Sequence, residues 1–427
     1  MESTATINPT EVKKPRPWRL IVILLLGLLA VGVSFGVRQS SWARERELKT
    51  LSVDELALAI HDSPNDSLTF FYYGSALLRS GNPDVAEQSF QHALKIDPKM
   101  ERAQVGLATA LMRQGKLQQA NQAFEAATKL NPKDAYAYMG IAQTYEMAGS
   151  AKRAIEPLKT ATQLEPKNAS AWYGLGKVYG EAHQPALAVE AINRAVQLAP
   201  NKADYWRDLG QLSRHYYKFP EAKQQYEKAI SLNASDPISH FWLGQLLVQM
   251  GDTPELRQKA EQELREAIRL GPDLPDAYFE LGQLYEHQEL WEKALEQFRT
   301  ARKLQNSSDD KSIYHEGFCL VKLGEAQKDP GKIKEGRELV AGSQALGEVK
   351  RQIADLTNRM IAEPQNRDLH LQLARLYSRI GNDSGALQNY ALYERMGAHD
   401  EAVAREAAAY QAQLQRAAQH APQNGSR

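Results

Sequence analysis

Residues 172–200 read WYGLGKVYGEAHQPALAVEAINRAVQLAP, and the pattern of this stretch decides the fold. Large apolar residues recur at helical intervals on both sides of a polar turn. Small residues stand between them at positions where two helix backbones must approach each other. Pro200 stops the second apolar segment. The stretch therefore predicts two short helices joined by a turn.

The same spacing recurs along the chain with a constant period. Alanines stand at equal intervals at Ala86, Ala120, Ala154, Ala188 and Ala222, and after one longer step the series continues at Ala260 and Ala294. A second alanine follows each member of the series at a fixed distance, from Ala93 to Ala301. A single helical hairpin cannot bury its apolar face alone, but a stack of hairpins can. The period therefore predicts an array of stacked helical hairpins.

The pattern resembles the tetratricopeptide repeat (TPR). The residues that carry the resemblance in the fourth unit are Trp172, Leu175, Gly176, Tyr179, Ala188, Ile192, Ala195 and Pro200. The resemblance implies an all-α fold, a right-handed α-solenoid of helix–turn–helix repeats. We expect seven TPR-like repeats over 67–308, and an irregular eighth unit, an extra helix and a ninth repeat over 309–400. A terminal capping helix and a disordered tail follow over 401–427.

One apolar segment precedes the repeats. Beyond an N-terminal tail of residues 1–19, residues 20–37 are 18 positions without a charge. As a helix they would be about 27 Å long, close to the ~30 Å hydrocarbon core of a bilayer. We therefore predict a transmembrane anchor in the lipid bilayer, with a cleaved signal peptide as the alternative. Residues 38–66 would form a juxtamembrane segment and a capping helix.

The flanks of this segment bear on topology. Four basic residues stand on each side of it, so the charge rule does not decide the orientation. The short tail before a first anchor favours a single-pass protein of the bacterial inner membrane, with the repeat domain in the periplasm. Gly32 and Gly36 have the spacing that lets two spans approach closely, which predicts a weak homodimer.

Composition narrows the function. Lys+Arg and Asp+Glu both number 52, so the formal net charge is zero and no nucleic-acid partner is expected. The one cysteine, Cys319, excludes a disulfide framework and a cysteine-rich metal site. The ten histidines show no ligand spacing. We therefore expect no enzyme, no catalytic residues, no cofactor and no metal.

The inner face of the solenoid is the remaining functional feature. In TPR proteins the first helices line the concave surface, and the resemblance implies that ligand contacts come from there. The candidates for a peptide groove are Phe71, Tyr136, Met139, Tyr173, Gln211, Phe241, Gln245, Phe279 and Gln283. Aromatic side chains would take apolar side chains of a peptide, and amides would hydrogen-bond its backbone. Alternatively, the aromatic residues pack between repeats and the glutamines are neutral helix surface.

Two functions follow from these observations. The first is a membrane-tethered TPR scaffold whose concave groove binds a peptide segment of an envelope or membrane-complex partner. The alternative is an accessory repeat protein linked to glycosyltransferase or envelope-assembly machinery. O-linked N-acetylglucosamine transferases carry similar repeat arrays, but no stretch of this chain outside the repeats is long enough for a catalytic domain of its own.

Overall fold

The computed structural model describes residues 43–305, 309–397 and 400–420. The chain divides into two compact units at Ala199 and Pro200, and each is described by itself. The predicted anchor over 20–37, with Gly32 and Gly36, lies outside the described residues. Within the described part of the chain, no helix has both the length and the apolar character needed to cross a membrane.

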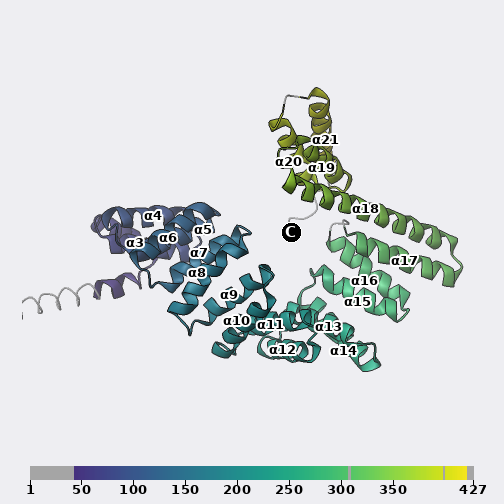
Figure 1. The fold of residues 1–427 in the computed structure, drawn as a ribbon, viewed down its shortest axis with the longest axis horizontal. Coiled ribbons are helices and arrows are strands. Elements are labelled where there is room, and N and C mark those ends of the chain that lie inside the picture. Colours follow the sequence, from purple (N-terminus) through teal and green to yellow (C-terminus); the bar gives the residue numbers. More distant parts are fainter. Residues whose placement is uncertain (1–42, 306–308, 398–399, 421–427) are drawn as a thin grey trace, which may run out of the picture. The chain divides into compact units, whose positions relative to one another are not determined.

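The first unit is a stack of helical hairpins (Figure 1). The capping helix α2 (Val53–Asp62) begins at Ser52, whose side chain and that of Glu55 form a reciprocal capping box. Four hairpins follow: α3 (Ser67–Arg79) with α4 (Pro83–Ile96), α5 (Glu101–Arg113) with α6 (Leu117–Leu130), α7 (Ala135–Met147) with α8 (Ala151–Leu164), and α9 (Ala169–Glu181) with α10 (Pro185–Leu198).

The second unit continues the same architecture. Its hairpins are α11 (Ala203–His215) with α12 (Phe219–Leu232), α13 (Pro237–Met250) with α14 (Pro254–Leu270), and α15 (Pro275–His287) with α16 (Trp291–Leu304). Beyond them lie α17 (Asp310–Gln327), α18 (Pro330–Ala362), α19 (Arg367–Arg379), α20 (Asp383–Arg395) and α21 (Glu401–His420). No strand occurs in the parts of the chain that the structure describes.

The recurring alanines lie where the helices of a hairpin cross. Both predicted columns, from Ala86 to Ala294 and from Ala93 to Ala301, are fully buried. The glycines that face them on the first helices have no room for a side chain. A Cβ atom added to Gly176, for example, would lie 2.3 Å from the Ile192 side chain and 3.2 Å from the Ala188 carbonyl oxygen. The small residues therefore set the close approach of the two helices.

Several hairpins also carry a hydrogen bond that the sequence pattern did not reveal. The large residue that opens a first helix bonds to a carbonyl oxygen in the preceding turn. The donors are the indole Nε1 atoms of Trp172 and Trp206 and the hydroxyl of Tyr278, at 3.0, 2.8 and 3.2 Å from the oxygens of Pro166, Pro200 and Pro272. The bond explains why a large residue with a polar edge suits this position.

The first helices of neighbouring hairpins contact one another more than the second helices do. In the first unit α3 contacts α5, α5 contacts α7, and α7 contacts α9; in the second unit α11 contacts α13 and α13 contacts α15. Elements on the inner side of a curved stack lie closer together. The first helices therefore line the concave face of each unit.

The region expected to hold an irregular eighth unit and a separate extra helix is built differently. α18 is one continuous helix of 33 residues, about 50 Å long. Its first part packs against α17 as the second helix of the eighth hairpin, and its later part packs against α19. Leu356, Leu369, Leu373 and Leu376 form the core of that second contact. The stretch that fits no repeat is thus the support for the α19–α20 hairpin.

Candidate functional site

A groove lies on the concave face of the first unit, where α3, α5 and the start of α7 meet. The space it encloses is about 530 Å³. Its floor is mostly apolar, with Phe71 and Val105 at the centre, and Tyr136 stands at one end with 59% of its surface exposed. The hydroxyls of Ser75 and Thr109, which also line it, donate to carbonyl oxygens of their own helices at 2.8 Å. These polar groups are satisfied without a ligand.

One edge of the groove is held by a cation. The guanidinium of Arg102 lies 5.2 Å from the centre of the Phe71 ring and forms an ion pair with Glu45 at 2.6 Å. Tyr72 donates a second hydrogen bond to the same carboxylate at 2.7 Å. The bonds from Arg102 and Tyr72 lower the pKa of Glu45 to about 2. Arg102 is thereby fixed over the aromatic floor, and the segment before α2 is tied to the groove.

Beside Arg102 the groove also carries two carboxyl groups that share a hydrogen bond, those of Glu101 and Asp134. Burial, together with the neighbouring carboxylate of Asp134, raises the pKa of Glu101 to about 7. Asp134 is oriented by its role as the N-cap of α7, where it accepts a hydrogen bond from the Tyr136 backbone N–H at 3.0 Å. Glu101 is therefore protonated below about pH 7 and negatively charged above it.

This carboxyl pair makes the stability of the first unit depend on pH. In the unfolded chain Glu101 ionises near its ordinary pKa of 4.5, whereas in the folded chain it ionises near 7. The stabilising contribution is therefore complete below about pH 4.5 and is lost as the pH rises through 7. Replacing Glu101 with glutamine should remove this pH dependence. The change in unfolding free energy that disappears between pH 4.5 and 7 is only on the order of 1 kcal/mol, because solvent screens the carboxyl groups.

Urea unfolding of the full chain measures the effect on stability across this pH range. Hydrogen exchange in α5 and α7 locates it in the first unit. The matched control is Glu125→Gln on α6, an exposed carboxyl outside the groove. Equal pH slopes for wild type and Glu101→Gln would show that folding does not raise the pKa of Glu101.

The structure brings together two of the nine groove candidates, Phe71 and Tyr136. Two more belong to the same unit but do not line this groove. Met139 is half-buried in the cluster of Leu158 and Leu175, and Tyr173 is half-buried farther along the stack, on α9. These positions on the concave face stay a prediction.

Of the five groove candidates in the second unit, some are buried or already hydrogen-bonded and others are exposed or half-buried. Phe241 is only 5% exposed and packs against Trp242 in the core, so its ring is not offered to a ligand. Gln245 donates its amide to Glu280 at 2.5 Å and is not a free donor. Phe279 is half-buried beside Phe298 and His315, as the packing alternative anticipated. Gln211 is exposed and Gln283 half-buried, and a backbone contact at either stays a prediction.

The structure shows why sequence reasoning missed part of the groove. Glu101 and Asp134 stand in successive repeats, and Arg102 reaches back to Glu45, which precedes the first hairpin. These pairs meet only because neighbouring elements stack in register. The repeat period is the signal that could have found the first pair, since it separates the two residues by almost one full unit.

Family comparisons agree with this architecture. Models of the tetratricopeptide repeat match residues 77–144, 169–202 and 256–310, and a further TPR model matches 148–182 and 218–251. The hairpins in these ranges are tetratricopeptide repeats. TPR arrays of this kind are typical of non-catalytic scaffolds, and the matches indicate no enzymatic domain. Among the described residues no group of three or more His, Cys, Asp or Glu side chains is arranged to hold a metal ion.

Several solved structures are similar to parts of the chain. YrrB, described as a TPR protein with an unusual peptide-binding site, is 25% identical with a TM-score of 0.37, covering 44% of this chain and 94% of its own. PilF of Pseudomonas aeruginosa is 20% identical with a TM-score of 0.42, covering 52% and 94%. The Cut9–Hcn1 assembly of the APC/C is 14% identical with a TM-score of 0.46, covering 68% and 52%. None of the curated proteins matches the chain.

Proposed function

We propose that this TPR protein is a scaffold that binds an extended peptide segment of a partner protein in the concave groove of its first unit. The observation that carries the proposal is the groove of about 530 Å³ with an apolar floor and charged side chains of both signs in its lining. An apolar side chain of the peptide would lie over Val105, beside the Phe71 ring and the Arg102 guanidinium that lies over it. A basic side chain would lie beside Glu101 and Asp134, and would bind more strongly above pH 7, where Glu101 is charged.

Truncating Tyr136 to alanine should weaken peptide binding by about tenfold to thirtyfold, because a half-exposed aromatic anchor at the groove becomes buried on binding. The ligand for this measurement is a fluorescent peptide selected from a random library against the full chain, and the readout is fluorescence anisotropy. Tyr217→Ala is the matched control, since Tyr217 is 82% exposed on the second unit. If wild type and Tyr136→Ala bind the peptide with equal affinity, Tyr136 does not contact the peptide.

We further propose that residues 20–37 anchor the scaffold in a membrane and that the repeats face the periplasm. The support is the uncharged run of 18 residues without a small-residue cleavage site close behind it. Protease added to intact spheroplasts should then degrade the repeats while a cytoplasmic marker survives. Degradation only after the membrane is permeabilised would contradict this orientation, and recovery of the chain from the soluble fraction would contradict the anchor. In the proposed arrangement the partner is another envelope protein.

A further inference from the structure

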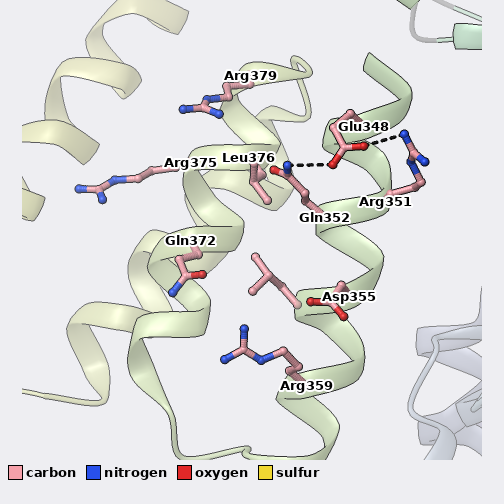
Figure 2. A pocket seen from close by; sticks show the side chains of 10 residues that line it. Glu348, Arg351, Gln352, Asp355, Arg359, Gln372, Arg375, Leu376 and Arg379 are labelled. Atoms are coloured by element: carbon pink, nitrogen blue, oxygen red, sulfur yellow. Dashed lines mark hydrogen bonds and ion pairs between the residues drawn. The ribbon is translucent and has the colours of Figure 1, made fainter. Parts of the chain in front are cut away.

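A second cavity lies in the other unit, outside the ranges that the TPR models match. It encloses about 580 Å³ between the later part of α18 and α19 (Figure 2). The cavity exists because α18 continues past the hairpin that it forms with α17 and offers a new face to α19. It is therefore a feature of the break in the repeat, and the concave groove of the first unit has no part in it.

The floor of this cavity is apolar and its walls are polar. Leu356 from α18 and Leu376 from α19 close the floor, with 6% and 8% of their surfaces exposed. The amides of Gln352 and Gln372 stand beside them on opposite helices. Figure 2 shows Leu376 directed from α19 toward α18, with Gln352 facing it. Because Gln352 donates its amide to Glu348 at 3.1 Å, one apolar side chain of a ligand can lie on this floor while its backbone meets the amide of Gln372.

Four arginines surround the cavity, and two of them are already engaged. Arg351 pairs with Glu348 at 2.6 Å. Arg375 points away from α18 in Figure 2 and pairs with Glu406 of α21 at 2.7 Å. These two guanidinium groups are held by carboxylates of the chain itself and are not the cations that a ligand would find.

The other two, Arg359 and Arg379, are exposed and stand on opposite helices. No carboxylate of the described residues lies within ion-pair distance of either one. In Figure 2 the guanidinium of Arg359 reaches from α18 into the space between the helices. A guanidinium presents a planar fork of N–H donors that matches a carboxylate in a bidentate arrangement. The cavity thus offers one such fork between the helices, from Arg359, and a second at its border, from Arg379, whose guanidinium points away from α18 in Figure 2.

We propose that this cavity, named here the arginine pocket, docks an acidic peptide segment of a partner protein, with aspartate or glutamate on both sides of a leucine-like residue. Its charge is complementary to such a segment, and its floor fits the apolar side chain. Glu348 and Asp355 also line the pocket, so the acidic residues of the segment would lie on the side of the two guanidinium groups and away from these carboxylates. The same two carboxylates can accept N–H groups of a peptide backbone. The scaffold then has a second docking site, independent of the concave groove.

The test uses the full chain and a fluorescein-labelled peptide of sequence Asp-Glu-Leu-Glu-Asp, with Asn-Gln-Leu-Gln-Asn as the uncharged match. Anisotropy at low salt should show the acidic peptide binding at least about tenfold more tightly than the amide peptide. The double variant Arg359→Gln, Arg379→Gln should lose the same factor, and added salt should weaken binding of the wild type. Arg337→Gln, an exposed arginine on the first part of α18, is the matched control.

Each outcome decides the proposal. Loss of binding in the double variant but not in Arg337→Gln, with unchanged circular dichroism and melting temperature, supports it. Equal binding of both peptides, or equal binding to wild type and double variant, overturns it. Tighter binding of a thymidine oligonucleotide, lost in the same double variant, would assign the pocket to nucleic acid instead. Thr109 and Tyr136 belong to the concave groove, so substitutions at these two residues should leave binding of the acidic peptide unchanged. The proposal for the arginine pocket and the proposal for the groove can therefore be contradicted independently.

Discussion

Replacing Ala188 with leucine should lower the free energy of unfolding by about 1–3 kcal/mol, because the larger side chain overpacks a crossing that has no space. Ala188 is completely buried, and its carbonyl oxygen lies 3.2 Å from where a Cβ atom of Gly176 would stand. Backbone therefore meets backbone at this point, and the two helices can admit a leucine only by moving apart. Denaturant unfolding of the full chain measures the loss.

The damage should stay near its origin, because each repeat contacts only its neighbours. Hydrogen exchange should lose protection in α9 and α10 and the adjoining helices, while α15 and α16 keep theirs. Ala186→Leu is the matched control, since Ala186 lies on the same helix but is exposed, and it should change stability little. A uniform loss of protection from α3 to α16 would contradict a stack of nearest-neighbour repeats.

Replacing Thr109 with tryptophan should weaken peptide binding by at least about thirtyfold, a loss of about 2 kcal/mol. Thr109 stands on α5, half-buried in the groove of about 530 Å³. An indole at this position would occupy the space that the apolar side chain of the peptide requires. Because the groove is open to solvent, the ring can be accommodated without unfolding the hairpin.

Thr128→Trp provides the control for this variant. Thr128 is also a half-buried threonine, and its hydroxyl bonds to the carbonyl of Glu125 on the second helix α6. That variant should bind the selected peptide with wild-type affinity, and circular dichroism should show that both variants remain helical. Equal loss in the two variants would indicate general damage, and no loss in Thr109→Trp would place the peptide elsewhere.

The fold of the repeats could be predicted because one physical requirement recurs in every unit. Alanine or glycine is needed wherever two backbones touch, so the columns through Ala188 and Gly176 are visible in the sequence itself. The continuous α18 could not be predicted in this way. Its two halves pack against different helices, so the apolar pattern changes partner midway, and Gly342 and Gly347 within it read as breaks.

The groove was predictable only in outline. The repeat position places Phe71, Tyr136 and Phe241 on the same side of their helices, but neighbouring side chains decide which of them stays accessible. Trp242 and the next hairpin cover Phe241, whereas no large neighbour covers Tyr136. The Glu101–Asp134 pair and the arginine pocket depend on the register between elements, which no pattern within one repeat contains.

Photo-crosslinking tests the central claim, that a peptide lies in the concave groove of the first unit, most directly. Benzoylphenylalanine in place of Tyr136 keeps an aromatic ring at this exposed position and adds a photoreactive benzophenone ketone at the end of the groove. The same residue in place of Tyr217 serves as the matched exposed control. The account predicts that illumination joins the selected peptide to the full chain at position 136 and not at 217. Crosslinking at 217 with none at 136 would contradict it.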